Sequence, residues 1–416
     1  MATIVKLADE QPFTLNVPQD ELKSLQVKLQ LTRLPDELEF AGHGYGMPLK
    51  DIERLLARWR DGFDWRKHES QLNAELPQFI RKIEVEGFGE LDIHYVHKQS
   101  RLDTAIPLLF IHGWPGSFIE VRKILPLLTE PSEDFPYFHV AAISLPGFGF
   151  SSAPTKKGFH LDQYAEVCHK LMLALGYNEY VVQGGDWGFY VGRRIANLYG
   201  KTHCKAWHTN FPRNINSLSP PSFWTNPLSY LKNLITPLTQ EERAGLEHSK
   251  KFQKDGRGYS VLQATRPQTL GYLLGDSPVG LLAWIYEKLV SWSDNYPWED
   301  DEVLTWVSIY WFSRSGPASS LRIYYEATRG PGRTAEESQI PLGYSIFPKE
   351  LYRPPTRWLW ERNLVFTSEH DEGGHFAAHE KPRMLVGDLR RMFGREGPAF
   401  GVVAKCSGYN ETNGST

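Results

Sequence analysis

Short apolar runs alternate with amphipathic stretches from about residue 106 onward, and this alternation limits the possible folds more than any other feature of the chain. The runs are rich in β-branched and aromatic residues and lie at 108–111, 140–143, 180–182, 343–346 and 364–367. Runs that are apolar on both sides suit strands of a parallel sheet covered on both faces. Helical patterns lie at 161–175, at 187–199 and after Pro382. The sequence therefore predicts an α/β fold with a mostly parallel, doubly wound sheet.

The alternation is interrupted between residues 213 and 330, where Pro, Trp and Tyr are frequent and the pattern indicates helix and loop. A helical insertion between two halves of one sheet is typical of a cap over the strand ends. We therefore expect a core in two parts, 96–212 and 331–398, around a cap at 213–330. An N-terminal arm, 1–95, contains two amphipathic helices and is expected to pack on the core. The C-terminal tail, 399–416, shows no pattern and is expected to be frayed.

Composition and charge exclude several classes of protein. The 416 residues are 23% charged and 41% hydrophobic with a net charge of −3, as in globular rather than disordered or coiled-coil chains. The small net charge gives no reason to expect nucleic acid or an anionic membrane as a partner. The three cysteines are widely spaced and odd in number, which does not suit a disulfide framework or a zinc site. The N-terminus does not resemble a signal peptide and no run of about 18 apolar residues occurs, so we expect a soluble, cytoplasmic protein without a membrane anchor.

The segment Gly184-Gly185-Asp186-Trp187-Gly188 lies directly after a predicted strand and directly before a predicted helix. Small residues two positions before and after a central polar residue are what a strained strand-to-helix turn requires. Such a turn presents the central side chain at the carboxyl edge of the sheet and aims the next N–H, that of Trp187, at a developing oxyanion. The central residue is Asp186, where esterases have Ser. Because a carboxylate needs no base, it can attack a strained or activated carbon and form an alkyl ester. The alternative interpretation is an ordinary turn in which Asp186 caps a helix.

The loop His112-Gly113-Trp114-Pro115-Gly116 follows the first predicted strand. In this architecture the same position supplies the second oxyanion donor. The glycines allow the backbone to approach closely and Pro115 fixes the loop, so we expect the N–H of Trp114 to point inward.

Two further residues, Glu350 and His375, complete a catalytic triad with Asp186. Along the chain the three occur in the order nucleophile, acid, histidine, which is the order that this fold uses. His375 follows the strand predicted at 364–367 and has two glycines before it, and Glu350 follows the strand predicted at 343–346. His375 would activate water, and Glu350 would hold its tautomer and stabilise the imidazolium. Other carboxylates lie near His375 in sequence: Glu369, Asp371 and Glu372. A carboxylate that orients a histidine must reach it from a neighbouring strand end, which favours Glu350.

A metal cluster is a competing interpretation of this region. His370, Asp371, His375 and His379 lie within ten residues of one another. However, the His-Glu-x-x-His spacing of a zinc-binding helix is absent, and a metal would leave the strand-to-helix turn and the oxyanion loop unexplained. We therefore expect neither metal nor cofactor.

Together these motifs resemble the microsomal-type epoxide hydrolases of the α/β-hydrolase fold, particularly their soluble fungal members. The similarity extends over nearly the whole chain. It rests on motifs at 59–65, 112–115, 184–188, 263–267, 276–283, 347–350 and 373–378. The resemblance implies an enzyme that converts an epoxide to a vicinal diol through a covalent ester on Asp186, which water activated by His375 and Glu350 then hydrolyses.

The resemblance also implies two residues that spacing does not single out. The family uses two cap tyrosines to bind and protonate the epoxide oxygen, and these match Tyr259 and Tyr324; Tyr325 is adjacent to the second. The aromatic cap suggests a small apolar or aromatic epoxide as substrate, with water as the second reactant.

Alternative functions remain open at this point. A haloalkane dehalogenase also uses a carboxylate at this turn but needs N–H donors for halide instead of cap hydroxyls. An epoxide-opening cyclase of a biosynthetic pathway would use an internal hydroxyl in place of water. A hydrolase fold without activity would only bind ligand. The sequence leaves the oligomeric state open, a homodimer included.

Overall fold

The computed structural model describes residues 10–130, 133–213, 218–220, 222–224, 227–330 and 338–410. Within these ranges nine strands form one sheet in the order β1-β2-β3-β5-β4-β6-β7-β8-β9. The strands are β1 (Gln11–Pro12), β2 (Gln78–Val85), β3 (Gly89–Lys98), β4 (Ile106–Ile111), β5 (Phe138–Ile143), β6 (Tyr180–Gly184), β7 (Cys204–Thr209), β8 (Leu342–Ile346) and β9 (Leu364–Glu369).

Strands β4 to β9 are parallel to one another, whereas β1, β2 and β3 pair in antiparallel fashion at one edge. β4 and β6 are buried along their whole length, as expected for apolar runs covered on both faces. The predicted α/β-hydrolase fold is thus confirmed. The sequence analysis missed β7, whose Lys205 and His208 interrupt the apolar pattern, and the β2–β3 hairpin, which lies in the region assigned to the arm.

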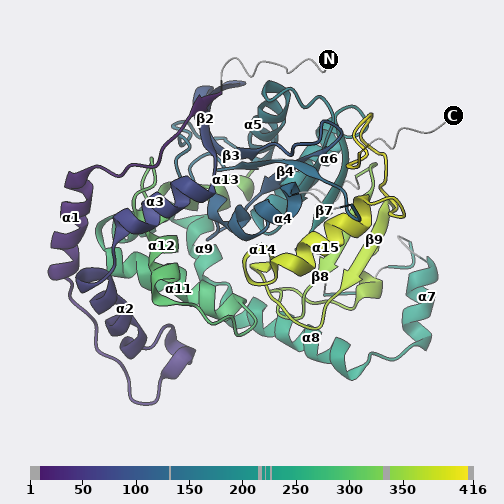
Figure 1. Ribbon diagram of the computed structural model, residues 1–416. Helices are drawn as coiled ribbons and strands as arrows, with labels where there is room; N and C mark the ends of the chain where they lie inside the picture. The colour runs from purple at the N-terminus through teal and green to yellow at the C-terminus, as the bar shows by residue number, and fades with distance from the viewer. Residues whose placement is uncertain are drawn as a thin grey trace.

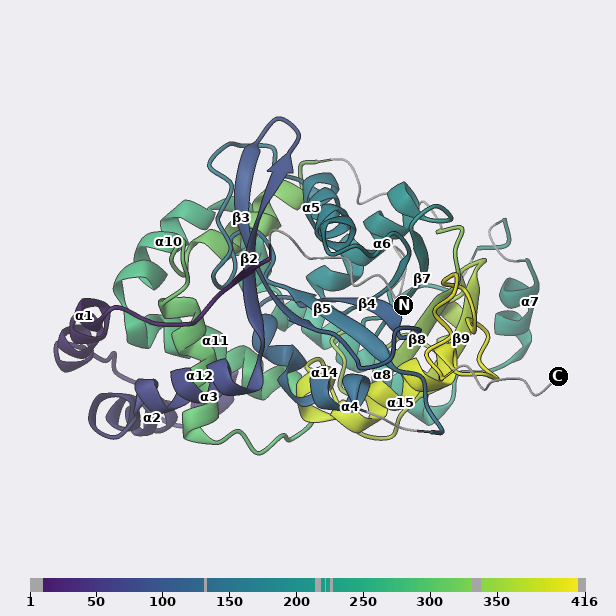
Figure 2. The same ribbon diagram turned by 45° about the horizontal axis from the view of Figure 1, so that its top comes forward.

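Helices cover both faces of the sheet (Figures 1 and 2). α5 (Leu161–Ala174) and α6 (Trp187–Tyr199) pack together on one face, and α4 (Leu125–Thr129), α14 (Ala377–Glu380) and α15 (Pro382–Phe393) lie on the other. α15 buries Leu385, Leu389, Met392 and Phe393 on the side predicted from their spacing.

The helical insertion leaves the sheet after β7 and returns before β8. Its helices are α7 (Pro227–Ile235), α8 (Gln240–Lys251), α9 (Gly258–Thr265), α10 (Pro267–Asp276), α11 (Pro278–Trp292), α12 (Asp300–Trp311) and α13 (Arg322–Ala327). α9 and α13 pack against each other. These two helices carry Tyr259 and Tyr324, so the insertion brings together residues that are far apart in sequence.

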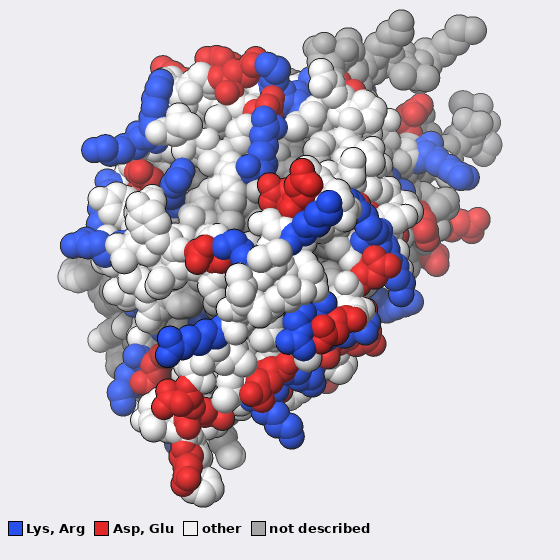
Figure 3. Space-filling view, turned by 90° about the vertical axis from the view of Figure 1, so that its left-hand side faces the viewer, with Lys and Arg blue, Asp and Glu red and all other residues white. Residues whose placement is uncertain are grey.

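The N-terminal region divides its contacts between the sheet and the cap. Its strands join the sheet, and the boundary expected at residue 95 falls inside β3. Its helices α1 (Gln19–Gln30) and α2 (Leu49–Asp61) lie against α11 and α12 of the cap, whereas α3 (Trp65–Glu75) leads into the sheet (Figure 1). Arg58 Nε lies 2.7 Å from Asp301 Oδ1, and Lys28 pairs with Asp276. On this side of the molecule, basic and acidic side chains are interleaved (Figure 3).

The C-terminal tail is not frayed over residues 399–410, and that prediction is wrong for this stretch. The Gly408 N–H donates to the Thr104 carbonyl at 2.8 Å, and the Gly408 carbonyl accepts from the Tyr137 N–H at 2.8 Å. Ala399, Val403 and Tyr409 are buried. Residues 411–416 lie outside the described ranges.

Among the described residues, no helix has both the length and the apolar character that a membrane crossing requires.

Candidate active site

Asp186 lies at the turn between β6 and α6, in a backbone conformation that is unusual for a residue with a side chain. Its φ is +50°, in the left-handed region, where only a well-supported turn keeps a non-glycine residue. The neighbouring positions 184 and 188 must be glycine because a side chain would not fit there. A Cβ at Gly188 would collide with the Ile111 carbonyl, and a Cβ at Gly184 would come within 2.6 Å of the Gly188 carbonyl oxygen. The small residues of the motif therefore allow the turn that projects Asp186.

The loop after β4 reaches Asp186 directly. The Trp114 N–H donates to Asp186 Oδ1 at 2.8 Å, and a Cβ at Gly113 would collide with the Asp186 side chain. The peptide bond between Trp114 and Pro115 is cis. Burial raises the pKa of Asp186, and the N–H groups of both Trp114 and Trp187 oppose that rise, so the two predicted oxyanion donors lie at the same carboxylate.

His112 holds this loop in place instead of facing the reacting groups. The Leu145 N–H donates to His112 Nε2 at 3.1 Å, so the ring proton is on Nδ1 and donates to the Gly113 carbonyl at 2.8 Å. Burial lowers the pKa of His112 to about 4, which keeps the ring neutral. The cap supports the same loop, since Trp306 Nε1 donates to the Pro115 carbonyl at 2.5 Å.

His375 and Glu350 lie at the carboxyl ends of neighbouring strands, β9 and β8, and they meet. His375 Nδ1 and Glu350 Oε1 are 2.7 Å apart, and both side chains are buried. On the other side of the ring, His375 Nε2 lies 3.7 Å from Asp186 Oδ2. The His375 N–H donates to the Trp292 carbonyl at 2.9 Å, and this contact fixes the loop against the end of α11. The structure therefore brings all three predicted triad residues together.

Burial and charge act in opposite directions on this triad. Burial by itself favours the neutral imidazole, but the charge and hydrogen bond of Glu350, aided by Asp186, outweigh it and raise the pKa of His375 to about 9. Burial raises the pKa of Asp186, whereas the charge of His375 and the loop N–H groups oppose that rise. Loss of the Asp186 charge would therefore lower the pKa of His375.

The cap places two tyrosines over Asp186. Tyr259 and Tyr324 are buried, and their ring centroids are 5.9 Å apart. The Trp114 ring stacks on Tyr259 with centroids 5.2 Å apart. Burial and the nearby Asp186 raise the pKa of both phenols well above its ordinary value, so both remain protonated. Tyr325 is instead half-buried under the guanidinium of Arg329, whose carbon lies 3.6 Å from the ring centroid.

Asp186 lies between two cavities of different size and lining. On the cap side, a cavity of about 210 Å³ is lined by Asp186, both tyrosines and further aromatic side chains, among them Tyr190, Phe211, Phe252 and Tyr352. On the core side, a chamber of about 20 Å³ is lined by Asp186, His375, Glu120, Asn210 and the oxyanion loop. We call these the cap-side cavity and the core-side chamber.

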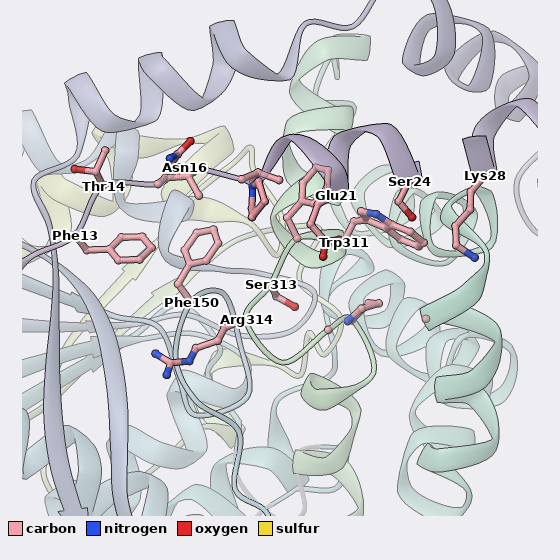
Figure 4. A pocket seen from close by; sticks show the side chains of 17 residues that line it. Phe13, Thr14, Asn16, Glu21, Ser24, Lys28, Phe150, Trp311, Ser313 and Arg314 are labelled. Carbon is pink, nitrogen blue, oxygen red and sulfur yellow. The ribbon is translucent and has the colours of Figure 1, made fainter. Parts of the chain in front are cut away.

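A larger cavity of about 700 Å³ lies away from these residues, between the N-terminal segment and the cap (Figure 4). Its lining includes Phe13, Phe150 and Trp311, together with the charged side chains of Lys28 and Arg314. Both charges are already paired, Lys28 with Asp276 and Arg314 with Asp92. Because it contains none of the predicted reacting groups, volume alone does not mark the active site.

The competing metal interpretation finds no support in the side-chain arrangement. His370 Nε2 lies 2.7 Å from Asp388, and His379 Nε2 lies 2.7 Å from Glu302. His375 faces Glu350. Among the described residues, no group of three or more His, Cys, Asp or Glu side chains converges as a metal site would require.

Sequence reasoning missed several residues at the site, among them two polar residues of the core-side chamber and a buried lysine near the cap tyrosines. Glu120 and Asn210 line the core-side chamber, and the buried ammonium of Lys288 lies 5.0 Å from the Tyr259 ring centroid. The one signal for Glu120 is an acidic residue inside the apolar stretch 118–121. Asn210 directly follows β7, a strand that was itself missed. Lys288 lies in an otherwise apolar helix, where a single charge does not reveal its neighbours.

Comparison with known proteins adds an independent finding. Residues 10–121 match the family described as "Epoxide hydrolase N terminus", and residues 106–251 match the family described as "alpha/beta hydrolase fold". Epoxide hydrolase 1 of Sus scrofa is 35% identical to this chain, in an alignment that covers 92% of this chain and 88% of the pig protein.

Solved structures agree with the sequence matches. The structure of Aspergillus niger epoxide hydrolase superposes with a TM-score of 0.79 at 36% identity, covering 91% of this chain and 94% of that one. The juvenile hormone epoxide hydrolase of Bombyx mori gives a TM-score of 0.80 at 28% identity, covering 92% and 95%. The likeness therefore includes the N-terminal region, the sheet and the cap.

Proposed function

The chain belongs to the epoxide hydrolase family of the α/β-hydrolase fold and is an enzyme that hydrolyses epoxides, and from that premise we propose how its own residues divide the reaction. Asp186 is the nucleophile, Tyr259 and Tyr324 are the acids, and His375 with Glu350 is the base. The observation that carries this proposal is the position of Asp186 between two phenols on one side and the His375–Glu350 pair on the other.

In the first step a carboxylate oxygen of Asp186 attacks an epoxide carbon. A C–O bond of the ring breaks, and the freed oxygen takes a proton from Tyr259 or Tyr324. Asp186 Oδ1 is held by the Trp114 N–H, which leaves Oδ2 as the attacking atom. A phenol suits the acid role because it is neutral at working pH and can stabilise an alkoxide as it forms.

In the second step water attacks the ester carbonyl carbon of Asp186 and gives a proton to His375 Nε2. The N–H groups of Trp114 and Trp187 hold the tetrahedral oxyanion, and losing one such donor typically costs about 3 kcal/mol in barrier. The bond to the alkyl oxygen breaks, and the diol leaves with the proton from His375. The carboxylic acid left on Asp186 returns a proton to the phenolate.

Formation of the ester prepares the base for this step. In the free enzyme the Asp186 carboxylate contributes to the raised pKa of His375. Alkylation removes that negative charge, so the imidazolium loses a stabilising neighbour and releases its proton to solvent before it accepts the proton of water. His375 takes up a proton from solvent again after the diol leaves and Asp186 regains its charge. Glu350 remains to hold the ring orientation.

We further propose that the substrate is a small apolar or aromatic epoxide. The cap-side cavity of about 210 Å³ and its aromatic lining support this choice, because such pockets bind apolar molecules and position them with a few polar groups.

A cytoplasmic location and a homodimer remain predictions, and light scattering of the purified protein tests the dimer.

A substrate panel tests the proposal. Purified enzyme is incubated with styrene oxide, with 1-chlorobutane and with an epoxide carrying an internal hydroxyl, and the products are separated by chromatography. We expect a vicinal diol from the two epoxides and no release of chloride. Chloride release would favour the dehalogenase alternative, and a cyclic ether from the third substrate would favour the cyclase.

A further inference from the structure

The core-side chamber has the size of a site for a single water molecule. Its volume of about 20 Å³ exceeds the roughly 10–15 Å³ that one water requires. A buried water also needs about two to four polar partners. Asp186, His375, Glu120 and Asn210 supply the polar side chains of the chamber.

Glu120 contributes unused hydrogen-bonding capacity to this set. It lies on a short 3₁₀ turn (Phe118–Lys123) and is 9% exposed. Its Oε1 atom is buried without a hydrogen-bond partner in the described ranges, a situation that typically costs about 1–3 kcal/mol. Asn210, by contrast, is engaged: it accepts from Gln183 at 2.9 Å and donates to the His375 carbonyl at 3.3 Å.

The oxyanion loop is shaped to admit this carboxyl group. A Cβ at Gly116 would collide with Glu120 Oε1, so glycine at this position leaves the space that the carboxyl oxygen occupies. The Tyr310 hydroxyl donates to the Gly116 carbonyl at 2.6 Å and fixes the turn. The position of Glu120 beside the chamber is thus set by the fold.

We propose that the core-side chamber holds the water that hydrolyses the ester, and that Glu120 binds this water together with His375. This inference rests on the proposed function. From the chamber the water reaches the Asp186 carbonyl carbon on the side away from the cap-side cavity, where the substrate enters. Its oxygen forms the new bond to that carbon, its proton passes to His375 Nε2, and Glu120 holds its position.

The protonation state of Glu120 fits this role. Burial, aided by the charge of Asp186, raises the pKa of Glu120 to about 8, although His375 and the N–H groups of Gly113 and Ser117 oppose the rise. At neutral pH the carboxyl is therefore mostly protonated and can both donate and accept a hydrogen bond. A neutral Glu120 also avoids a further negative charge beside Asp186.

The test separates ester formation from ester hydrolysis. Wild type and the Glu120→Met and Glu120→Gln variants react with styrene oxide under single-turnover conditions, and the ester on Asp186 is followed by acid quench and mass spectrometry. Glu120→Met retains the volume but cannot bind water through a carboxyl, so we expect hydrolysis to slow by about 10- to 100-fold with ester formation within about threefold of wild type. Glu120→Gln can still donate and accept, so its hydrolysis should stay within about tenfold of wild type. Hydrolysis at the wild-type rate in Glu120→Met would overturn the proposal.

Ser117→Ala is the matched control. Ser117 caps the same turn through its hydroxyl, which accepts from the Ile119 N–H at 3.4 Å, but it does not line the chamber. We expect both rates of Ser117→Ala to match wild type. Slowing of hydrolysis as large as in Glu120→Met would show that the turn, and not the carboxyl group, is responsible, and would overturn the proposal.

Two further outcomes keep the inference separate from the proposed function. If Glu120→Met does not fold, Glu120→Asp replaces it, because the shorter side chain withdraws the carboxyl from the chamber. Hydrolysis slower in Glu120→Asp than in Glu120→Gln would support the proposal, and the opposite order would contradict it. Absence of any ester in wild type, with diol still formed, would instead contradict the proposed function and with it the water site.

Discussion

The two cavities that meet at Asp186 differ in size, polarity and origin. The cap-side cavity is about ten times larger, and nearly half of the residues that line it are aromatic and come from segments far apart in sequence. The core-side chamber is lined by groups from strand ends and from the oxyanion loop, and it contains the charged or titratable side chains of His375 and Glu120. In the proposed mechanism, phenols that stay neutral serve ring opening on the cap side, and His375 with Glu350 serves water activation on the core side. If the two chemical steps take place on opposite sides of Asp186, as we propose, they should be separable by mutation.

Asp186→Ala removes the one residue, among those that the structure describes, that lines both cavities. We expect kcat/KM for styrene oxide to fall by at least about 10⁴-fold, because neither the phenols nor the base can act without the ester. Diol formation measured by chromatography gives the rate, and circular dichroism confirms the fold. Substantial remaining turnover would contradict the assignment of the nucleophile.

His375→Gln affects the core side alone. We expect the ester to form at nearly the wild-type rate and its hydrolysis to slow by about 10³-fold or more, because no base remains to take the proton of water. Intact-mass measurement after mixing with substrate should show the protein carrying one added epoxide. If no adduct at Asp186 can be trapped, the division of labour between the two sides is wrong.

Replacing Tyr259 and Tyr324 together by Phe affects the cap side alone. We expect ester formation to slow by about 100-fold or more, whereas each single variant loses about tenfold, since the other phenol can still donate. Rapid-quench kinetics measures the rate of ester formation. Tyr325→Phe is the matched control. Tyr325 lies next to the site but faces Arg329, so this variant should behave as wild type. An unchanged rate of alkylation in the double variant would refute the role of the cap tyrosines.

The pH dependence of the free energy of unfolding also distinguishes the two sides, and the expected effect is smaller than the changes in rate described above. The pKa of His375 is raised to about 9 from an ordinary value of 6.5, so the folded state binds this proton more tightly than the unfolded chain. That stabilisation is complete below pH 6.5 and is lost as the pH rises through 9. We therefore expect the free energy of unfolding of wild type to fall relative to His375→Gln between pH 6.5 and 10, as measured by urea denaturation. In wild type the phenols of Tyr259 and Tyr324 stay neutral over most of this range, so the double tyrosine variant, which lacks them, should retain the wild-type pH dependence.

The core side could be predicted largely from the sequence because its information is local. Asp186 lies at the sheet edge because its turn, which only small residues allow, connects a strand to a helix. Trp114 and His375 are likewise predicted there because each follows a strand. The match between predicted and observed strands follows from apolar runs that only a buried parallel sheet can accommodate.

The cap side could not be predicted from residues alone. Tyr259 and Tyr324 are two of 19 tyrosines, and only the family resemblance singled them out. Their meeting depends on how α9 packs against α13, a long-range contact that leaves no periodic signal in either helix. The same reason explains why the contact of α1 and α2 with the cap was missed, and why Glu120 was passed over in an apolar turn.

The most direct test of the covalent route is a single turnover with enzyme in excess over styrene oxide in ¹⁸O-labelled water. The account predicts that the diol of the first turnover carries no label, because its new oxygen comes from Asp186, and that the label appears in the Asp186 carboxylate instead. Labelled diol in the first turnover would mean that water attacks the epoxide directly, and would contradict the covalent ester on which the account rests.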